Sequence, residues 1–212
     1  VSISFVIDQG DDTTTSVGSG TLTFGGGAPF DSHSVTISSD AFGSLKYNGE
    51  GGDSAQNAVG DTAAGNIWDN FDGKGGTTVR ESRSGDNIIH YTLPSMVDGV
   101  TAAVSYTPAT GEDESDTAYA LTYTGIEGLS VSYGAGSNDG QAAGSGGSTT
   151  NTDTTSIKAS YAYGPVTIAY SDHESDSNTA TSDQDATSFK LSYTISDALS
   201  VSYAEEEIDS NG

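Results

Sequence analysis

The chain has 212 residues, of which 30 are acidic and 6 basic, and its formal net charge is −24. This balance argues against nucleic-acid binding, which needs clustered Lys and Arg, and against docking on an anionic cytoplasmic leaflet. Because cysteine is absent, a disulfide framework, a thiolate metal site and a cysteine nucleophile are excluded.

The hydrophobic pattern predicts an all-β protein. No stretch approaches the roughly 18 apolar residues of a membrane-spanning helix, and no helical periodicity runs far along the chain. Short segments instead alternate apolar and polar residues and usually close on an aromatic residue. Disordered segments are depleted in aromatic and β-branched residues, so this alternation also argues against disorder.

Twelve strands are predicted in chain order, each recognised by the residues on its apolar side. In the first half these are Ile3/Phe5/Ile7, Leu22/Phe24, Val35/Ile37, Leu45/Tyr47 and Ile89/Tyr91/Leu93. In the second half they are Ala102/Val104/Tyr106, Tyr119/Leu121/Tyr123, Leu129/Val131/Tyr133, Ile157/Ala159/Tyr161/Tyr163, Val166/Ile168/Tyr170, Phe189/Leu191/Tyr193 and Leu199/Val201/Tyr203.

The connections alternate between short and long from Val35 onward. The short ones are Ser39–Gly43, Pro94–Asp98, Gly125–Gly128, Gly164–Pro165 and Ser196–Asp197, and the long ones are Gly49–Asp86, Thr107–Asp116, Ala135–Asp153 and Ser171–Asp185. Outer-membrane barrels have short turns on one side and long loops on the other, whereas a soluble sandwich has less reason to separate them. The long Gln9–Ser19 link, which should be short by this rule, breaks the alternation.

The tyrosines favour a membrane barrel over a sandwich core. Most of the 11 lie on the apolar face near strand ends, which predicts two aromatic girdles at the membrane interfaces. In a sandwich core their hydroxyls would need buried partners. The predicted fold is therefore an antiparallel up-and-down transmembrane β-barrel.

Two segments resemble the general-diffusion porins of Gram-negative bacteria, especially the acidic porins of α-proteobacteria. Ser34–Asn48 (SVTISSDAFGSLKYN) resembles the strand–turn–strand unit with a Phe-Gly corner that leads into the long third loop. Asp86–Val100 (DNIIHYTLPSMVDGV) resembles the strand after that loop, although Leu93-Pro94-Ser95 replaces the usual Ser-Pro core. The remaining strands match in character only.

The resemblance implies a passive channel for small hydrophilic solutes and ions in the bacterial outer membrane. It implies a homotrimer in contact with outer-membrane lipid and lipopolysaccharide. Residues 1–212 are expected to form one domain, incomplete at both ends, within a sixteen-stranded barrel; a complete twelve-stranded barrel is the alternative. Residues 49–86 are expected to be the third loop, which in porins folds inward and narrows the pore.

Charged residues in and near this loop are the candidate site. The acids expected at the pore constriction are Glu50, Asp53, Asp61, Asp69 and Asp72. The bases expected on the pore wall are Lys46, Arg80, Arg83, Lys158 and Lys190. The resemblance implies a transverse field between loop acids and wall bases, and the acidic excess predicts a preference for cations. In the sequence IWDNF, Trp68 and Phe71 are expected to anchor the loop to the barrel wall.

Catalysis and cofactors are not predicted. The chain has no G-x-S-x-G, P-loop or H-E-x-x-H motif, and His33, His90 and His173 lack metal-ligand spacing. The acidic stretches 111–116, 171–176 and 182–185 are expected to be solvated external loops, with Ca²⁺ binding as the lesser alternative. The alternative function is a secreted or cell-surface structural or adhesive β protein with acidic, calcium-binding loops. A jelly-roll hydrolase or lectin is disfavoured because the aromatics share the face of Ile and Val.

Overall fold

A computed structural model describes residues 2–6, 32–65, 79, 81–109, 114–139, 151–178 and 183–210. These residues form eleven strands and a single turn of 3-10 helix. The strands are β1 (Ser2–Val6), β2 (Ser32–Ser39), β3 (Gly43–Asn48), β4 (Ile88–Thr92), β5 (Val100–Thr107), β6 (Asp116–Tyr123), β7 (Leu129–Asp139), β8 (Asn151–Tyr163), β9 (Val166–Ser177), β10 (Gln184–Ser196) and β11 (Leu199–Ser210); the helical turn η1 is Ala55–Ala58. None of the helical structure in these ranges is long and apolar enough to cross a membrane.

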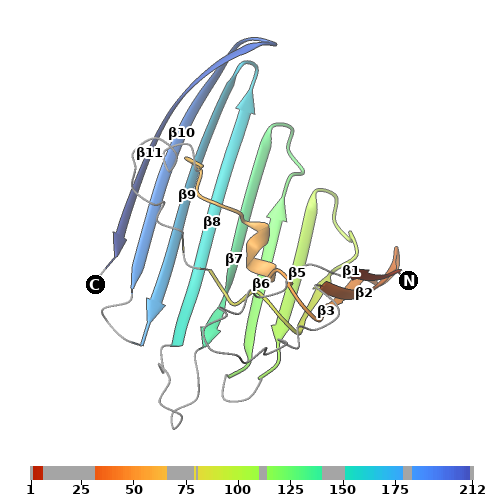
Figure 1. Cartoon of the computed structure of the whole chain (residues 1–212). Coiled ribbons are helices and arrows are strands. Elements are labelled where there is room, and N and C mark those ends of the chain that lie inside the picture. The colour runs from red at the N-terminus through yellow and green to blue at the C-terminus, as the bar shows by residue number, and fades with distance from the viewer. Residues whose placement is uncertain are drawn as a thin grey trace, which may run out of the picture.

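Each strand pairs antiparallel with the next one along the chain, so the strands form a single up-and-down sheet (Figure 1). Among the described strands, β1 and β11 are the two edges, and the sheet is open. The predicted all-β, antiparallel, up-and-down architecture is confirmed.

The start of the sheet corrects one expectation. β1 pairs directly with β2, so that Ile3 lies opposite Val35 and Phe5 opposite His33. No strand therefore lies between β1 and β2 in the sheet, and the Gln9–Ser19 link lies outside the described residues. The strand predicted at Leu22/Phe24 lies outside the described residues.

Several strands are longer than predicted at the end that carries the long connections. β7 continues to Asp139, β8 begins at Asn151, β9 continues to Ser177 and β10 begins at Gln184. The acidic stretch 171–176 is therefore strand and not external loop, and residues 184 and 185 of the last acidic stretch are also strand. Sequence alternation could not reveal these extensions because both of their faces carry polar residues.

The two faces of the sheet differ in polarity. In contrast to a soluble protein, the large apolar side chains are mostly exposed and small or polar side chains are buried. Large apolar side chains are exposed on one face; Ile168 is 44% exposed, Leu191 41% and Val201 56%. Small side chains such as Ala186 and Ser171 are buried on the other face. A sheet whose apolar face is covered by lipid and whose polar face lines a wet interior has this pattern.

Aromatic side chains bracket the aliphatic ones along the exposed face. In β6, Leu121 lies between Tyr119 and Tyr123, and in β10, Leu191 lies between Phe189 and Tyr193. Tyr119 and Tyr133 on neighbouring strands bring their ring centroids to 6.1 Å. This order of residues is what two interfacial belts around an aliphatic band require.

Candidate functional site

The segment after β3 crosses the polar face of the sheet. Figure 1 shows η1 lying over the middle of the sheet, where it packs against β6 and β7. We call residues 49–65 the outgoing arm, residues 81–86 the return arm, and the two together the inner loop. The residues between the arms, apart from Val79, lie outside the described part of the chain.

Serine hydroxyls on the polar face of the sheet, which we call the wall, accept hydrogen bonds from the backbone of the outgoing arm. Three serines on the polar face accept hydrogen bonds from its amides: Ser105 of β5 from Ala55 (2.9 Å), Ser171 of β9 from Ala63 (2.9 Å) and Ser188 of β10 from Ala64 (3.2 Å). At the edge strand β11, the hydroxyl of Thr62 donates to the carboxylate of Glu206. The outgoing arm is thus fastened at successive points from β5 to β11.

The buried side chain of Gln56 joins both arms to the wall. Its Nε2 donates to Ser156 Oγ (2.9 Å), and its Oε1 accepts from Thr154 Oγ1 (2.6 Å) and from the Ser82 amide (2.8 Å). Such a buried amide stabilises the docked loop only because its polar atoms are hydrogen-bonded. A glycine lies beneath it: a Cβ on Gly134 would stand 3.0 Å from Gln56 Cγ, so the loop approaches the wall where the wall has no side chain.

Two wall lysines also bind the inner loop. Lys158 Nζ donates to the carbonyl of Asp61 at 2.7 Å, and Lys190 Nζ to the carbonyl of Ala64 at 3.5 Å. Both lysines lie on the polar face, as predicted from their positions in the alternation, but their ammonium groups are directed at loop carbonyls. In this arrangement the two lysines hold the loop against the sheet by hydrogen bonds to its backbone carbonyls.

Lys46 has different surroundings. It lies opposite His90 in the β3–β4 register, and both line a hollow of about 250 Å³ together with Asn48 and Asp53. His90 Nδ1 donates to the Asp53 carbonyl at 3.2 Å. Within the described part of the chain, the Lys46 ammonium makes no hydrogen bond or ion pair, so its charge is available to the hollow.

Two acids of the outgoing arm, Asp53 and Asp61, act electrostatically on Glu81 of the return arm. Asp53 and Asp61 are exposed and Glu81 is half-buried. Burial raises the pKa of the Glu81 carboxyl above its usual range, and the negative charges of Asp61 and Asp53 raise it further. Glu81 was not among the predicted site residues, although it lies in the segment 49–86 from which the other acids were chosen.

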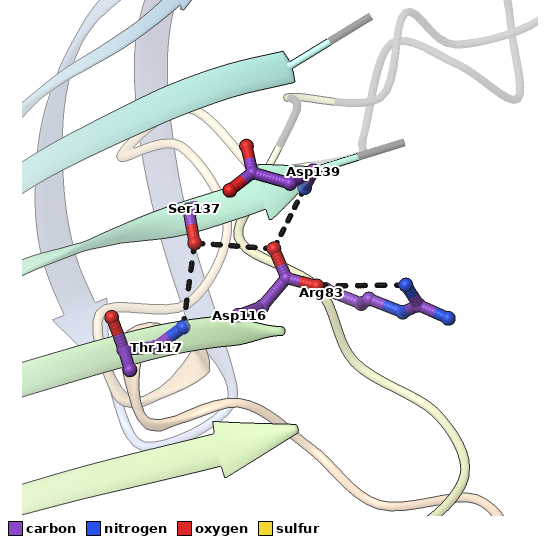
Figure 2. Close-up of polar contacts among 5 residues, drawn as sticks. All are labelled: Arg83, Asp116, Thr117, Ser137 and Asp139. Atoms are coloured by element: carbon purple, nitrogen blue, oxygen red, sulfur yellow. Dashed lines mark hydrogen bonds and ion pairs between the residues drawn. The ribbon is translucent and has the colours of Figure 1, made fainter. Parts of the chain in front are cut away.

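Half-buried Arg83 forms an ion pair with a buried carboxylate. Its Nη1 lies 3.5 Å from Asp116 Oδ2, at the point where the return arm meets the start of β6 and the end of β7 (Figure 2). Its backbone amide donates to the Ser137 carbonyl at 2.9 Å. The positive charge of Arg83 is therefore matched to a carboxylate of the wall.

The remaining predicted site residues divide into two groups. Glu50 lies on the outgoing arm and precedes Asp53 and Asp61 in the sequence. Asp69, Asp72, Arg80, Trp68 and Phe71 lie outside the described residues, so their predicted roles stay predictions. The residues that fasten the loop, above all Gln56 and the serines, were missed because Ser is common on every strand and carries no distinguishing pattern.

A family model described as Gram-negative porin matches residues 1–212. No curated protein sequence matches the chain significantly.

Among solved structures, the chain is similar in fold to an anion-selective porin from Comamonas acidovorans, with a TM-score of 0.56 and 17% identity, covering 84% of this chain and 57% of that one. It is also similar to OmpT, an outer membrane protein of Vibrio cholerae, with a TM-score of 0.56 and 14% identity, covering 85% of this chain and 60% of that one. The chain therefore spans less than two thirds of either structure.

Proposed function

This chain belongs to the family of Gram-negative porins, proteins of the bacterial outer membrane, and from that membership we propose how it conducts. It forms part of a water-filled channel for the passive diffusion of small hydrophilic solutes and ions, with a preference for cations. The inner loop is the constriction, and the polar face of the sheet is the wall of the lumen. A narrower membership, in the acidic porins of α-proteobacteria, stays a prediction.

The distribution of charge around the inner loop carries the proposed cation preference. The acids Asp53 and Asp61 are exposed on the loop, and the charges of both act on the Glu81 carboxyl. Of the nearby bases, Lys158 is bound to a loop carbonyl and Arg83 to a buried carboxylate. A constriction whose free charges are negative raises the local concentration of cations.

Lys46 is the proposed counterpart of these acids on the opposite side of the hollow. Lys46 and Asp53 line the same hollow, and charges at a partly enclosed surface are screened less than charges in bulk solution. A field between them would act across the path of a permeating solute. We propose a homotrimer and contacts with lipopolysaccharide for the intact protein, as the family resemblance implies.

A shared fold does not decide selectivity. The porin from Comamonas acidovorans is described as anion-selective, and its resemblance at 17% identity concerns the fold alone. Selectivity depends on the side chains at the narrowest point, which differ freely within one barrel architecture. The acidic inner loop of this chain therefore supports a preference opposite to that of this structural relative.

The test is the reversal potential of the intact protein in planar bilayers under a salt gradient. We expect cation preference, a decrease in it for the variant D53N/D61N, and an increase for Lys46→Met. The matched control is D176N, which removes a carboxylate from the exposed outer end of β9. Anion preference in the unsubstituted protein, or equal effects of D53N/D61N and D176N, would contradict the proposal.

A further inference from the structure

Asp116 joins the wall of the sheet to the inner loop. It begins β6 and is 2% exposed. Its Oδ1 accepts hydrogen bonds from the Asp139 amide (2.7 Å) and from Ser137 Oγ (3.1 Å), both at the end of β7. Its Oδ2 faces Arg83 of the return arm, as Figure 2 shows. One oxygen of this carboxylate therefore bonds to the wall and the other pairs with the loop.

The return arm makes two kinds of contact. Ser82 and Ser84 bond to the outgoing arm: Ser82 Oγ donates to Ser54 Oγ at 2.7 Å, and the Ser54 amide donates to Ser84 Oγ at 2.9 Å. Arg83, between them, bonds to the wall through its amide and its guanidinium. The contacts of the two serines hold the arms together, whereas those of Arg83 fix the return arm to β6 and β7.

We propose that Asp116 is a positioning residue for ion selection, acting through Arg83. Glu81 precedes Arg83 by two residues on the same short arm, so the ion pair fixes where the Glu81 carboxylate stands relative to Asp53 and Asp61. This inference rests on the proposed function, because it assigns to Asp116 the placement of the acids at the proposed constriction. Asp116 itself is buried at the start of β6, so in this proposal it acts on the constriction through Arg83.

Burial of Asp116, beside a half-buried Arg83, strengthens the pair as a link between wall and loop. Charges withdrawn from solvent are screened less by salt than exposed ones, so their attraction persists at physiological ionic strength. If the return arm leaves the wall, the buried Asp116 carboxylate loses its counter-charge, which is an unfavourable state for a buried ion. The docked position of the arm is therefore favoured over a released one.

One substitution at Asp116 can remove the ion pair and keep the hydrogen bonds within the wall. D116N keeps an oxygen that can accept from the Asp139 amide and from Ser137, so the bonds within the wall are retained. It removes the charge that Arg83 pairs with. R83Q removes the other half of the pair from the loop side and leaves the wall unchanged, and Arg83→Lys preserves the charge.

The experiment compares the intact protein with D116N, R83Q, D116N/R83Q, Arg83→Lys and the control D176N in planar bilayers. Migration of unboiled and boiled samples on a denaturing gel first shows that each variant retains its folded form. We expect D116N and R83Q each to lower the cation-to-anion permeability ratio relative to the unsubstituted protein and to D176N. The double variant should lower the permeability ratio no further than either single variant does. The ratio of Arg83→Lys should stay near that of the unsubstituted protein.

Three results would overturn the inference. One is that D116N and R83Q conduct and select ions as the control does. Another is that their effects add fully in the double variant, because independent residues add and partners do not. The third applies if D116N does not fold: folded R83Q would then decide alone, and unchanged selectivity in it would refute the link. Absence of any channel in the unsubstituted protein would instead refute the proposed function.

Discussion

At the scale of single residues, side chains of the same type on the same face of the sheet have different roles. Lys46 and Lys158 both point to the polar face of their strands, and sequence alone gives them the same role on the pore wall. In the folded chain Lys158 lies beneath the inner loop and donates to the Asp61 carbonyl, whereas Lys46 lies beyond the covered area and lines an open hollow. Which lysine is covered depends on the path of the loop, and no local pattern encodes that path.

Glu81 gives a prediction about pH. Because the pKa of its carboxyl is raised in the docked loop, docking favours the protonated form. The associated stabilisation is complete below the ordinary glutamate pKa and is lost as pH rises through the raised pKa. Conversely, as pH falls through the raised pKa, Glu81 loses its charge before exposed carboxylates do, and cation preference should begin to fall there.

The measurement is the reversal potential of the unsubstituted protein and of E81Q over a range of acidic pH. We expect the decline in cation preference to begin at higher pH in the unsubstituted protein than in E81Q. Superimposable curves would show that Glu81 does not contribute to selection. D176N serves again as the control, since its carboxylate lies on the opposite face from the inner loop.

At the scale of elements, the inner loop packs over a row of small side chains on neighbouring strands, which we call the track. The register brings Ala120 of β6, Gly134 of β7 and Ser156 of β8 into one row beneath η1. The Cβ that Gly134 lacks would stand 2.9 Å from Val59 Cγ2. A loop without an apolar core beneath it thus gains close contact through small wall residues and many hydrogen bonds.

Filling this track should displace the loop and leave the barrel intact. Gly134→Val introduces atoms where Val59 and Gln56 already lie, and overpacking of this kind costs about 1–3 kcal/mol. We expect changed single-channel conductance together with unchanged heat-modifiability on a gel. The matched control is Ser130→Val, on the same strand and the same face. Equal conductance of the two variants would contradict a close approach of η1 to Gly134.

At the scale of the whole molecule, the exposed and buried faces are inverted relative to a soluble protein. The inner face is occupied mainly by Ala, Ser, Thr and Gly, and most of the large apolar side chains point outward from the sheet, although Ile88 is fully buried. With lipid outside, burial in the membrane replaces burial in a core as the source of hydrophobic stabilisation. The loop on the inner face is then held by polar contacts, as its hydrogen bonds to Ser105, Ser171 and Ser188 illustrate.

Neighbouring positions on β10 test this inversion. Leu191 faces outward in the aliphatic band, and Ser192 faces inward. An arginine at the middle of a lipid-facing band costs about 2–4 kcal/mol, whereas one in a wet lumen costs little. We therefore expect Leu191→Arg to reduce stability in lipid by that amount and Ser192→Arg to be tolerated. Folding in bilayers of defined composition, followed by denaturant titration, measures both, and equal destabilisation would argue against lipid on the Leu191 side.

The sequence by itself determined the class of fold, the strands and the two faces of the sheet. These follow from an alternation with a period of two residues, which is a local property of a strand and is readable from Leu199/Val201/Tyr203 as from Ile89/Tyr91. The alternation of short and long connections is equally local, and it was enough to indicate a barrel. Where both faces are polar, as in 171–176, the local signal disappears and the strand ends were misjudged.

Only the tertiary structure decided how the inner loop is held and which charges remain free. Gln56 and Ser156 are separated by 100 positions in sequence, and their contact depends on the register of every strand between them. Register is a cumulative property of the sheet, so no single segment carries it. The pairing of Arg83 with Asp116, the covering of Lys158 and the exposure of Lys46 all result from that cumulative geometry, which is why residues of identical type and parity acquire different functions.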